Sequence, residues 1–162
     1  MGKTDWKAKA KALKKKLKSL DLPPPPKKTA KPVSPLAPKT GFPKLPRIAG
    51  ASFAAIEAGV RYKSRRDVML VHLAPGTSVA GVFTTSSTRA GCVRDCQAKL
   101  AMKVPAGAGA AIVVNSGNSN AFTGAVGDTA VAEVCARVAT ALGIPETRVF
   151  SSSTGVIGEP LP

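Results

Sequence analysis

The pattern of apolar and polar positions separates a polar first third of the chain from a patterned remainder. Short, partly alternating apolar runs occupy residues 51–59, 66–75 and 78–86, and Pro-Gly-Thr separates the last two runs. Runs of this length that are rich in β-branched residues and bounded by turn signals are typical of strands. Because the connections are short, the pattern predicts that these three segments form an antiparallel meander.

Helical periodicity follows the predicted meander. Residues 89–104 and 128–143 each carry one apolar stripe at helical spacing. The stripes consist of Cys92, Cys96, Leu100 and Val104 in the first segment and of Val131, Val134, Cys135, Val138 and Leu142 in the second. Pro105 is expected to end the first helix, while Asp128 suits the N-cap of the second helix and Gly143 its left-handed C-cap.

Two further strands complete the predicted fold. The continuous apolar run 110–114 suits a strand that is buried on both faces, and residues 148–155 begin as a strand and end in glycine-flanked turns. The predicted order is therefore β-β-β-α-β-α-β. This order is typical of an α/β fold in which a mixed β-sheet is layered against helices.

Charge and proline content set the first 47 residues apart. They carry fourteen lysines or arginines against Asp5 and Asp21, a formal charge of +12, whereas residues 48–162 have a formal charge of only +3. Nine prolines lie between Leu22 and Arg47, and proline removes backbone donors and forces the preceding residue to be extended. The sequence thus predicts a disordered, basic, Pro-rich tail at 1–47 and a folded domain at 48–162.

Cysteine and hydrophobic content exclude several classes of protein. Cys92, Cys96 and Cys135 are an odd number in a chain without a secretory signal, which favours a reducing, cytoplasmic setting over a disulfide framework. With His72 as the single histidine, we expect no metal site, since zinc takes about four ligands. No apolar run approaches the roughly 20 residues that a membrane-spanning helix requires.

Polar loops follow two of the predicted strands, at the strand ends where open α/β sheets place ligands. The first loop holds Asn115, Asn118 and Asn120, which either bind amide or carboxylate groups or satisfy the backbone of the loop itself. In the second loop, the hydroxyl of Thr154 and the backbone N–H of Gly155 suit an oxyanion hole for acyl transfer. Such a hole also requires a nucleophile that creates the negative charge.

Two isolated groups are weaker candidates. His72 lies in an alternating strand, where a packed or edge histidine is the more common case than a general base. Glu159 follows the second glycine of the last loop and either anchors an amine or is solvated. Serine, histidine and aspartate are not ordered along this chain as a convincing catalytic triad.

Three long strings carry a resemblance to a known family. They are S-V-A-G-V-F-T-T at 78–85, A-I-V-V-N-S-G-N-S-N-A-F-T-G at 111–124 and S-S-T-G-V-I-G-E-P-L at 152–161, and V-S-P-L-A-P-K at 33–39 adds to them. The chain resembles the amino-terminal, α-chain half of the bifunctional ornithine acetyltransferase/N-acetylglutamate synthase (glutamate N-acetyltransferase) family of arginine biosynthesis. The resemblance covers residues 33–162.

The resemblance implies an activity and partners. Members of this family cleave themselves ahead of a threonine, which becomes the nucleophile at the head of a β-chain, and the two chains usually form a heterotetramer. Acetyl passes from N2-acetylornithine to glutamate, and acetyl-CoA serves some members as a donor; no cofactor or metal is involved. In the family pattern Thr154 and Gly155 form the oxyanion hole. The cleavage segment does not occur in these 162 residues, so the resemblance implies an α-chain truncated before its processing point and inactive alone.

The alternative from another functional class is a non-catalytic α/β binding module. In that case the cationic residues 1–31 would contact nucleic acid or an anionic membrane. This alternative accounts for the tail but not for the three strings between residues 78 and 161. Binding through the tail would weaken steeply with added salt.

Overall fold

The computed structural model describes residues 11–12, 15, 35–41 and 43–162. The predictions made for the remaining residues of the tail lie outside the described residues. The chain divides into two compact units, Met1–Leu45 and Pro46–Pro162. All of the helices and strands discussed below belong to the second unit.

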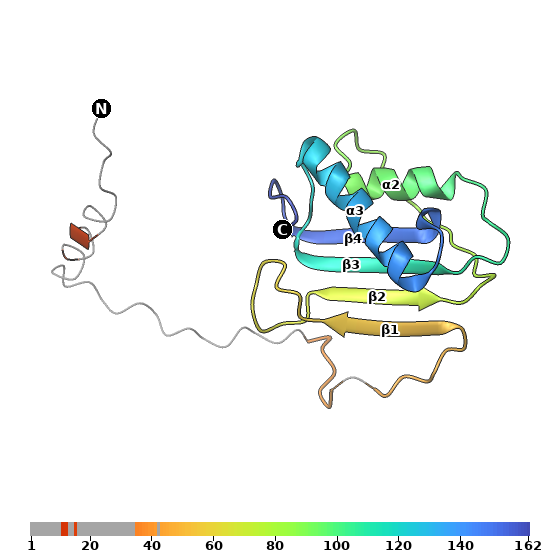
Figure 1. Cartoon of the computed structure of the whole chain (residues 1–162). Helices are drawn as coiled ribbons and strands as arrows, with labels where there is room; N and C mark the ends of the chain where they lie inside the picture. The colour runs from red at the N-terminus through yellow and green to blue at the C-terminus, as the bar shows by residue number, and fades with distance from the viewer. Residues whose placement is uncertain (1–10, 13–14, 16–34, 42) are drawn as a thin grey trace. The chain divides into compact units, whose positions relative to one another are not determined.

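The second unit contains a four-stranded mixed sheet (Figure 1). The strands are β1 (Ala51–Ile56), β2 (Val68–Leu73), β3 (Ala110–Asn118) and β4 (Val149–Val156), and they lie side by side in that order. Neighbouring strands β1 and β2, and β2 and β3, are antiparallel, whereas β3 and β4 are parallel. The predicted α/β class with a mixed sheet is confirmed.

Two helices cover the β3–β4 half of the sheet, and β1 is left uncovered (Figure 1). Helix α3 (Gly124–Leu142) packs on β3 and β4 through a cluster that includes Val131, Cys135, Val113 and Val149. Helix α2 (Gly91–Leu100) packs against β4, and the short 3-10 helix η1 (Glu146–Arg148) leads into that strand. Parallel pairing of β3 with β4 follows because α3 forms the crossover between them.

The strand predicted at 78–86 does not form. These residues are irregular, and β3 instead occupies the position beside β2. Val79 and Phe83 pack against Cys96 and Phe150, whereas Val82 is 99% exposed. The alternation of apolar residues therefore indicates that one side of the segment is buried against α2 and β4. An irregular segment can bury one side in this way without the hydrogen bonds of a strand.

Helix ends differ from the predicted ones, apart from one. Helix α2 stops at Leu100, and Val104 lies beyond it with 54% of its surface exposed. Helix α3 begins four residues before Asp128, with Thr123 at its N-cap position. Gly143 adopts the predicted left-handed C-cap, with φ of 64° and ψ of 33°. No helix among the described residues is both long and apolar enough to cross a bilayer.

Candidate active site

Thr154 and Gly155 lie near the carboxyl end of β4, beside the carboxyl end of β3. Both residues are exposed. In the register of the two strands Thr154 pairs with Ser116 and Gly155 with Gly117, after which the pairing is interrupted by a bulge at Asn118. The site therefore lies at the edge of the sheet where parallel strands end, which is where α/β folds commonly bind ligands.

Gly155 lies against the backbone of β3. Its φ is 133°, and a Cβ atom at this position would lie 2.3 Å from the carbonyl carbon of Gly117 and 2.6 Å from the amide nitrogen of Asn118. A side chain would meet main-chain atoms that have no rotamer to change. Glycine is thus required here both for its conformation and for its size.

The asparagine side chains form hydrogen bonds with the backbone and side chains of their own region. Of the two interpretations left open by the sequence, ligand binding or bonding within the loop, the structure favours the second. Asn118, 3% exposed, donates through Nδ2 to the carbonyl of Pro160 at 2.7 Å and accepts through Oδ1 from the amide of Asn120 at 2.8 Å. Asn115 donates to the carbonyl of Asn118 at 2.8 Å and accepts from the hydroxyl of Ser153 at 2.6 Å. These contacts hold the segment after β4 against the end of β3.

Asn120 links the same loop to the start of α3. It is fully buried, and its Nδ2 donates to the carbonyl of Gly127 at 2.9 Å while its Oδ1 accepts from the Thr123 hydroxyl at 2.9 Å. Ser119 adds a second tie, since its amide and its hydroxyl both donate to the carbonyl of Val156, at 2.9 and 2.8 Å. The polar side chains of this loop connect β3, β4 and α3 through hydrogen bonds, and most of them are not free to bind a ligand.

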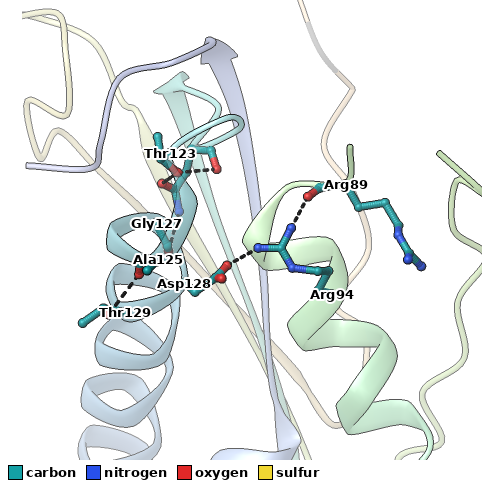
Figure 2. A network of polar contacts seen from close by, with 8 residues as sticks. Arg89, Arg94, Thr123, Ala125, Gly127, Asp128 and Thr129 are labelled. Carbon is teal, nitrogen blue, oxygen red and sulfur yellow. Dashed lines mark hydrogen bonds and ion pairs between the residues drawn. The ribbon is translucent and has the colours of Figure 1, made fainter. Parts of the chain in front are cut away.

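The starts of α2 and α3 are joined by one arginine (Figure 2). Arg94 donates to the carboxylate of Asp128 and to the carbonyl of Arg89, and Figure 2 shows its guanidinium between these two groups. Asp128 therefore holds the two helices together instead of capping α3. A cavity of about 330 Å³ lies beside this junction and is lined in part by Arg89, Arg94 and Phe122.

A buried carboxylate organises the loop between β1 and β2. Asp67, 3% exposed, accepts hydrogen bonds from the amides of Ala58 and Val60, each at 2.7 Å. The hydrogen bond from Ala58 is the main cause that holds the pKa of Asp67 below its ordinary value, against the opposing effect of burial. Asp67 was not among the predicted site residues, and its only sequence signal is its place directly before the apolar run that forms β2.

The same loop presents its arginines to the end of β3. Arg65 donates through NH2 to the hydroxyl of Ser116 at 2.8 Å, and Arg61 forms an ion pair with Glu159. Glu159 is therefore an ion-pair partner of Arg61 whose side chain stays half exposed to solvent. In Figure 1 this loop and the ends of β3 and β4 lie at the same end of the sheet. Sequence reasoning missed both arginines because the distance between them and β4 along the chain is large.

The cavity between the sheet and α3 has a mainly apolar lining. Its volume is about 430 Å³, and it is lined in large part by valines, with Asn115 from β3 and Ser151 and Ser153 from β4. The hydroxyl of Ser151 is buried and has no hydrogen-bond partner among the described residues. Thr154 and Gly155 do not line this cavity.

The remaining candidates lie elsewhere or are inert. His72 pairs with Ala111 near the start of β3, at the opposite end of the sheet from Thr154. Burial raises the pKa of both Cys96 and Cys135, so these thiols stay protonated at neutral pH. Cys92, Cys96 and Cys135 are free and buried, as expected, and the described residues contain no cluster of three or more metal-binding side chains.

Comparison with known proteins identifies similar chains. Residues 52–162 match the model of the ArgJ family. The chain is 63% identical over 131 residues to the arginine biosynthesis bifunctional protein ArgJ of Ruegeria pomeroyi and 52% identical over 129 residues to that of Bradyrhizobium diazoefficiens. Each alignment covers 80% of this chain, but 31% and 30% of the respective relative. The chain thus spans about a third of the length of these curated relatives.

Two solved structures share the fold. The arginine biosynthesis bifunctional protein ArgJ of Bacillus halodurans superimposes with a TM-score of 0.63 at 35% identity, covering 70% of this chain and 58% of the other. The ornithine acetyltransferase of Mycobacterium tuberculosis, solved in complex with ornithine, has a TM-score of 0.60 at 33% identity and covers 70% of this chain and 60% of the other.

Proposed function

Because this chain belongs to the ArgJ family, we propose that it forms the oxyanion-binding part of an acetyltransferase of arginine biosynthesis. The observation that carries the proposal is the family match over residues 52–162, which contains Thr154 and Gly155 at an exposed strand end. The ornithine in the structure of the Mycobacterium tuberculosis relative supports a small amino-acid substrate.

In the proposed reaction the acetyl group moves from N2-acetylornithine to glutamate. A threonine hydroxyl on the β-chain attacks the acetyl carbonyl, and the α-amino group of that threonine takes the hydroxyl proton. The carbonyl oxygen becomes negative in the tetrahedral intermediate, where Thr154 and Gly155 donate hydrogen bonds to it. Collapse of the intermediate releases ornithine, whose departing nitrogen takes the proton back from the threonine ammonium group. The amine of glutamate then attacks the acetyl-enzyme and expels the threonine hydroxyl, which gives N-acetylglutamate. Acetyl-CoA is an alternative acetyl donor.

The proposal includes a partner chain and a compartment. The self-processed, threonine-headed β-chain would complete the site, with two α and two β chains in the assembly. A cytoplasmic location is consistent with three free, buried thiols. The alternative of a nucleic-acid or membrane-binding module is not favoured, because it does not explain why residues 52–162 match an enzyme family.

Replacement of Thr154 tests the proposal in the complete two-chain protein. Thr154→Ala removes one oxyanion donor, and we expect kcat for acetyl transfer from N2-acetylornithine to glutamate to fall by about 10²-fold or more. Steady-state kinetics and a thermal melt of the variant measure the two effects separately. The matched control is Ser152→Ala, which removes an exposed hydroxyl two residues earlier on the same strand. A Thr154→Ala variant with activity within a few-fold of the parent contradicts the proposal.

A further inference from the structure

A cationic loop stands next to the proposed oxyanion site. The segment between β1 and β2 contains Arg61, Lys63, Arg65 and Arg66 around one aromatic residue, Tyr62. The buried carboxylate of Asp67 fixes the base of this loop through the amides of Ala58 and Val60. The charges are therefore presented by an organised turn and not by a free surface segment.

Arg65 reaches the residue that pairs with Thr154. Its NH2 group donates to the Ser116 hydroxyl at 2.8 Å, and Ser116 pairs with Thr154 across the parallel β3–β4 ladder. Residues paired in this way project from the same face of a sheet, on strands about 4.8 Å apart. The guanidinium of Arg65 and the side chain of Thr154 therefore flank Ser116 on one face.

The charge on Arg65 is uncompensated, whereas that on its neighbour is paired. Arg61 forms an ion pair with Glu159, but Arg65 forms no ion pair with any residue that the structure describes. The guanidinium carbon of Arg65 lies 4.8 Å from the ring centre of Tyr62, and stacking of this kind limits the orientations of a guanidinium. A guanidinium has five N–H donors, so most of them remain after one is used on Ser116.

We propose that Arg65 binds an anionic group of the substrate beside the Thr154–Gly155 site. The group is either the carboxylate of the amino-acid substrates or a phosphate of acetyl-CoA, and a guanidinium binds both through paired N–H donors. Tyr62 orients the cation, and Ser116 holds it on the face from which Thr154 projects. This inference rests on the proposed function, because it assigns a substrate contact to the same site.

The test uses Arg65→Gln and Arg65→Lys in the complete two-chain protein. For Arg65→Gln we expect KM of the anion-bearing substrate to rise about tenfold or more with kcat within about threefold, since a charge-assisted hydrogen bond is lost. Arg65→Lys keeps the charge without the planar fork and should recover part of the loss. Lys63→Gln is the matched control: it removes the same charge from the same exposed loop and should leave KM unchanged.

Separate titrations identify the anion. Higher KM values for N2-acetylornithine and glutamate, with that for acetyl-CoA unchanged, assign Arg65 to the carboxylate; the opposite result assigns it to phosphate. If no KM changes while Thr154→Ala still lowers kcat, the role of Arg65 is wrong and the proposed function stands. If the complete protein shows no acetyl transfer, the proposed function fails. In that case calorimetry with N-acetylglutamate and with coenzyme A tests the proposed role of Arg65. Weaker binding to Arg65→Gln than to the parent supports the role, and equal or undetectable binding overturns it.

Discussion

Gly155 is the residue at which local backbone geometry and the proposed chemistry meet. We expect Gly155→Ala to lower the free energy of unfolding by at least about 2 kcal/mol, because a Cβ would overlap the main chain of Gly117 and because φ of 133° is unfavourable for alanine. Urea denaturation measures this loss, and kinetics on the folded fraction measures any loss of acetyl transfer.

Replacing Gly158 shows the cost of the backbone angle alone, without the steric overlap found at Gly155. It also has a positive φ, 82°, but a Cβ there would meet no atom within 4 Å. Gly158→Ala is therefore expected to cost only about 1 kcal/mol, the ordinary penalty of left-handed backbone. Equal losses in the two alanine variants would show that the close contact between Gly155 and Gly117 is not a determinant of stability.

Residue-level features were predictable where one short segment contains them. Thr154 and Gly155 could be named from the sequence because the glycine-flanked turn and the family resemblance lie in the same string, although their role as oxyanion donors stays a prediction. Arg65 could not be named, since its proximity to Thr154 depends on β2 lying beside β3 and β3 beside β4. Register across three strands is a property of the folded sheet and has no local sequence signal.

At the scale of elements, α2 is attached to β4 by a buried lysine. Lys99, with a side chain 6% exposed, donates to the carbonyl of Val149 at 3.0 Å and forms an ion pair with Asp95 at 2.8 Å. Burial opposes the charged form of Lys99, but the hydrogen bond and the negative charge of Asp95 favour it, and the pKa of Lys99 is raised. We expect Lys99→Met to lower the free energy of unfolding by about 3 kcal/mol, because Asp95 and the strand carbonyl lose their partner.

A surface pair with the same helical spacing provides the comparison. Arg137 and Glu133 on α3 are also an i,i+4 ion pair, but both side chains are largely exposed. Arg137→Met should change the free energy of unfolding by no more than about 0.5 kcal/mol. Replacing both Lys99 and Asp95 by apolar residues should recover much of the loss. If Lys99→Met costs no more than Arg137→Met in chemical denaturation, the attachment of α2 to β4 does not depend on this lysine.

Elements were predictable where packing and periodicity agree. The valine and cysteine stripe of α3 faces the sheet as expected, and the run 110–114 forms the first half of β3. The 78–86 segment was wrong as a strand because Val79 and Phe83 find apolar partners on α2 and β4 without ladder hydrogen bonds. The start of α3 was misplaced because Asp128, a good N-cap residue, forms an ion pair with Arg94 instead.

At the scale of the whole molecule, a buried acidic residue, Asp67, organises the loop at the end of the sheet that contains the proposed site. Asp67 accepts hydrogen bonds from the amides of Ala58 and Val60 and so fixes the conformation of the loop that carries Arg65. The ionisation of Asp67 therefore links pH to both stability and site geometry. Its folded-state pKa lies below the ordinary value, chiefly through the Ala58 amide. A carboxyl of this kind contributes stability that is fully present above its unfolded pKa of about 3.9 and is lost as pH falls through the folded pKa.

We therefore expect the free energy of unfolding to decrease as pH is lowered below about 4, and Asp67→Asn to remove part of that decrease. Asparagine keeps the size of aspartate but offers only one oxygen acceptor for two amide donors, so the variant should also be less stable than the parent at pH 7. Urea denaturation between pH 7 and pH 3 measures both effects. Parallel pH curves for the parent and Asp67→Asn would mean that another group causes the acid instability, and that protonation of Asp67 does not release the loop beside Thr154.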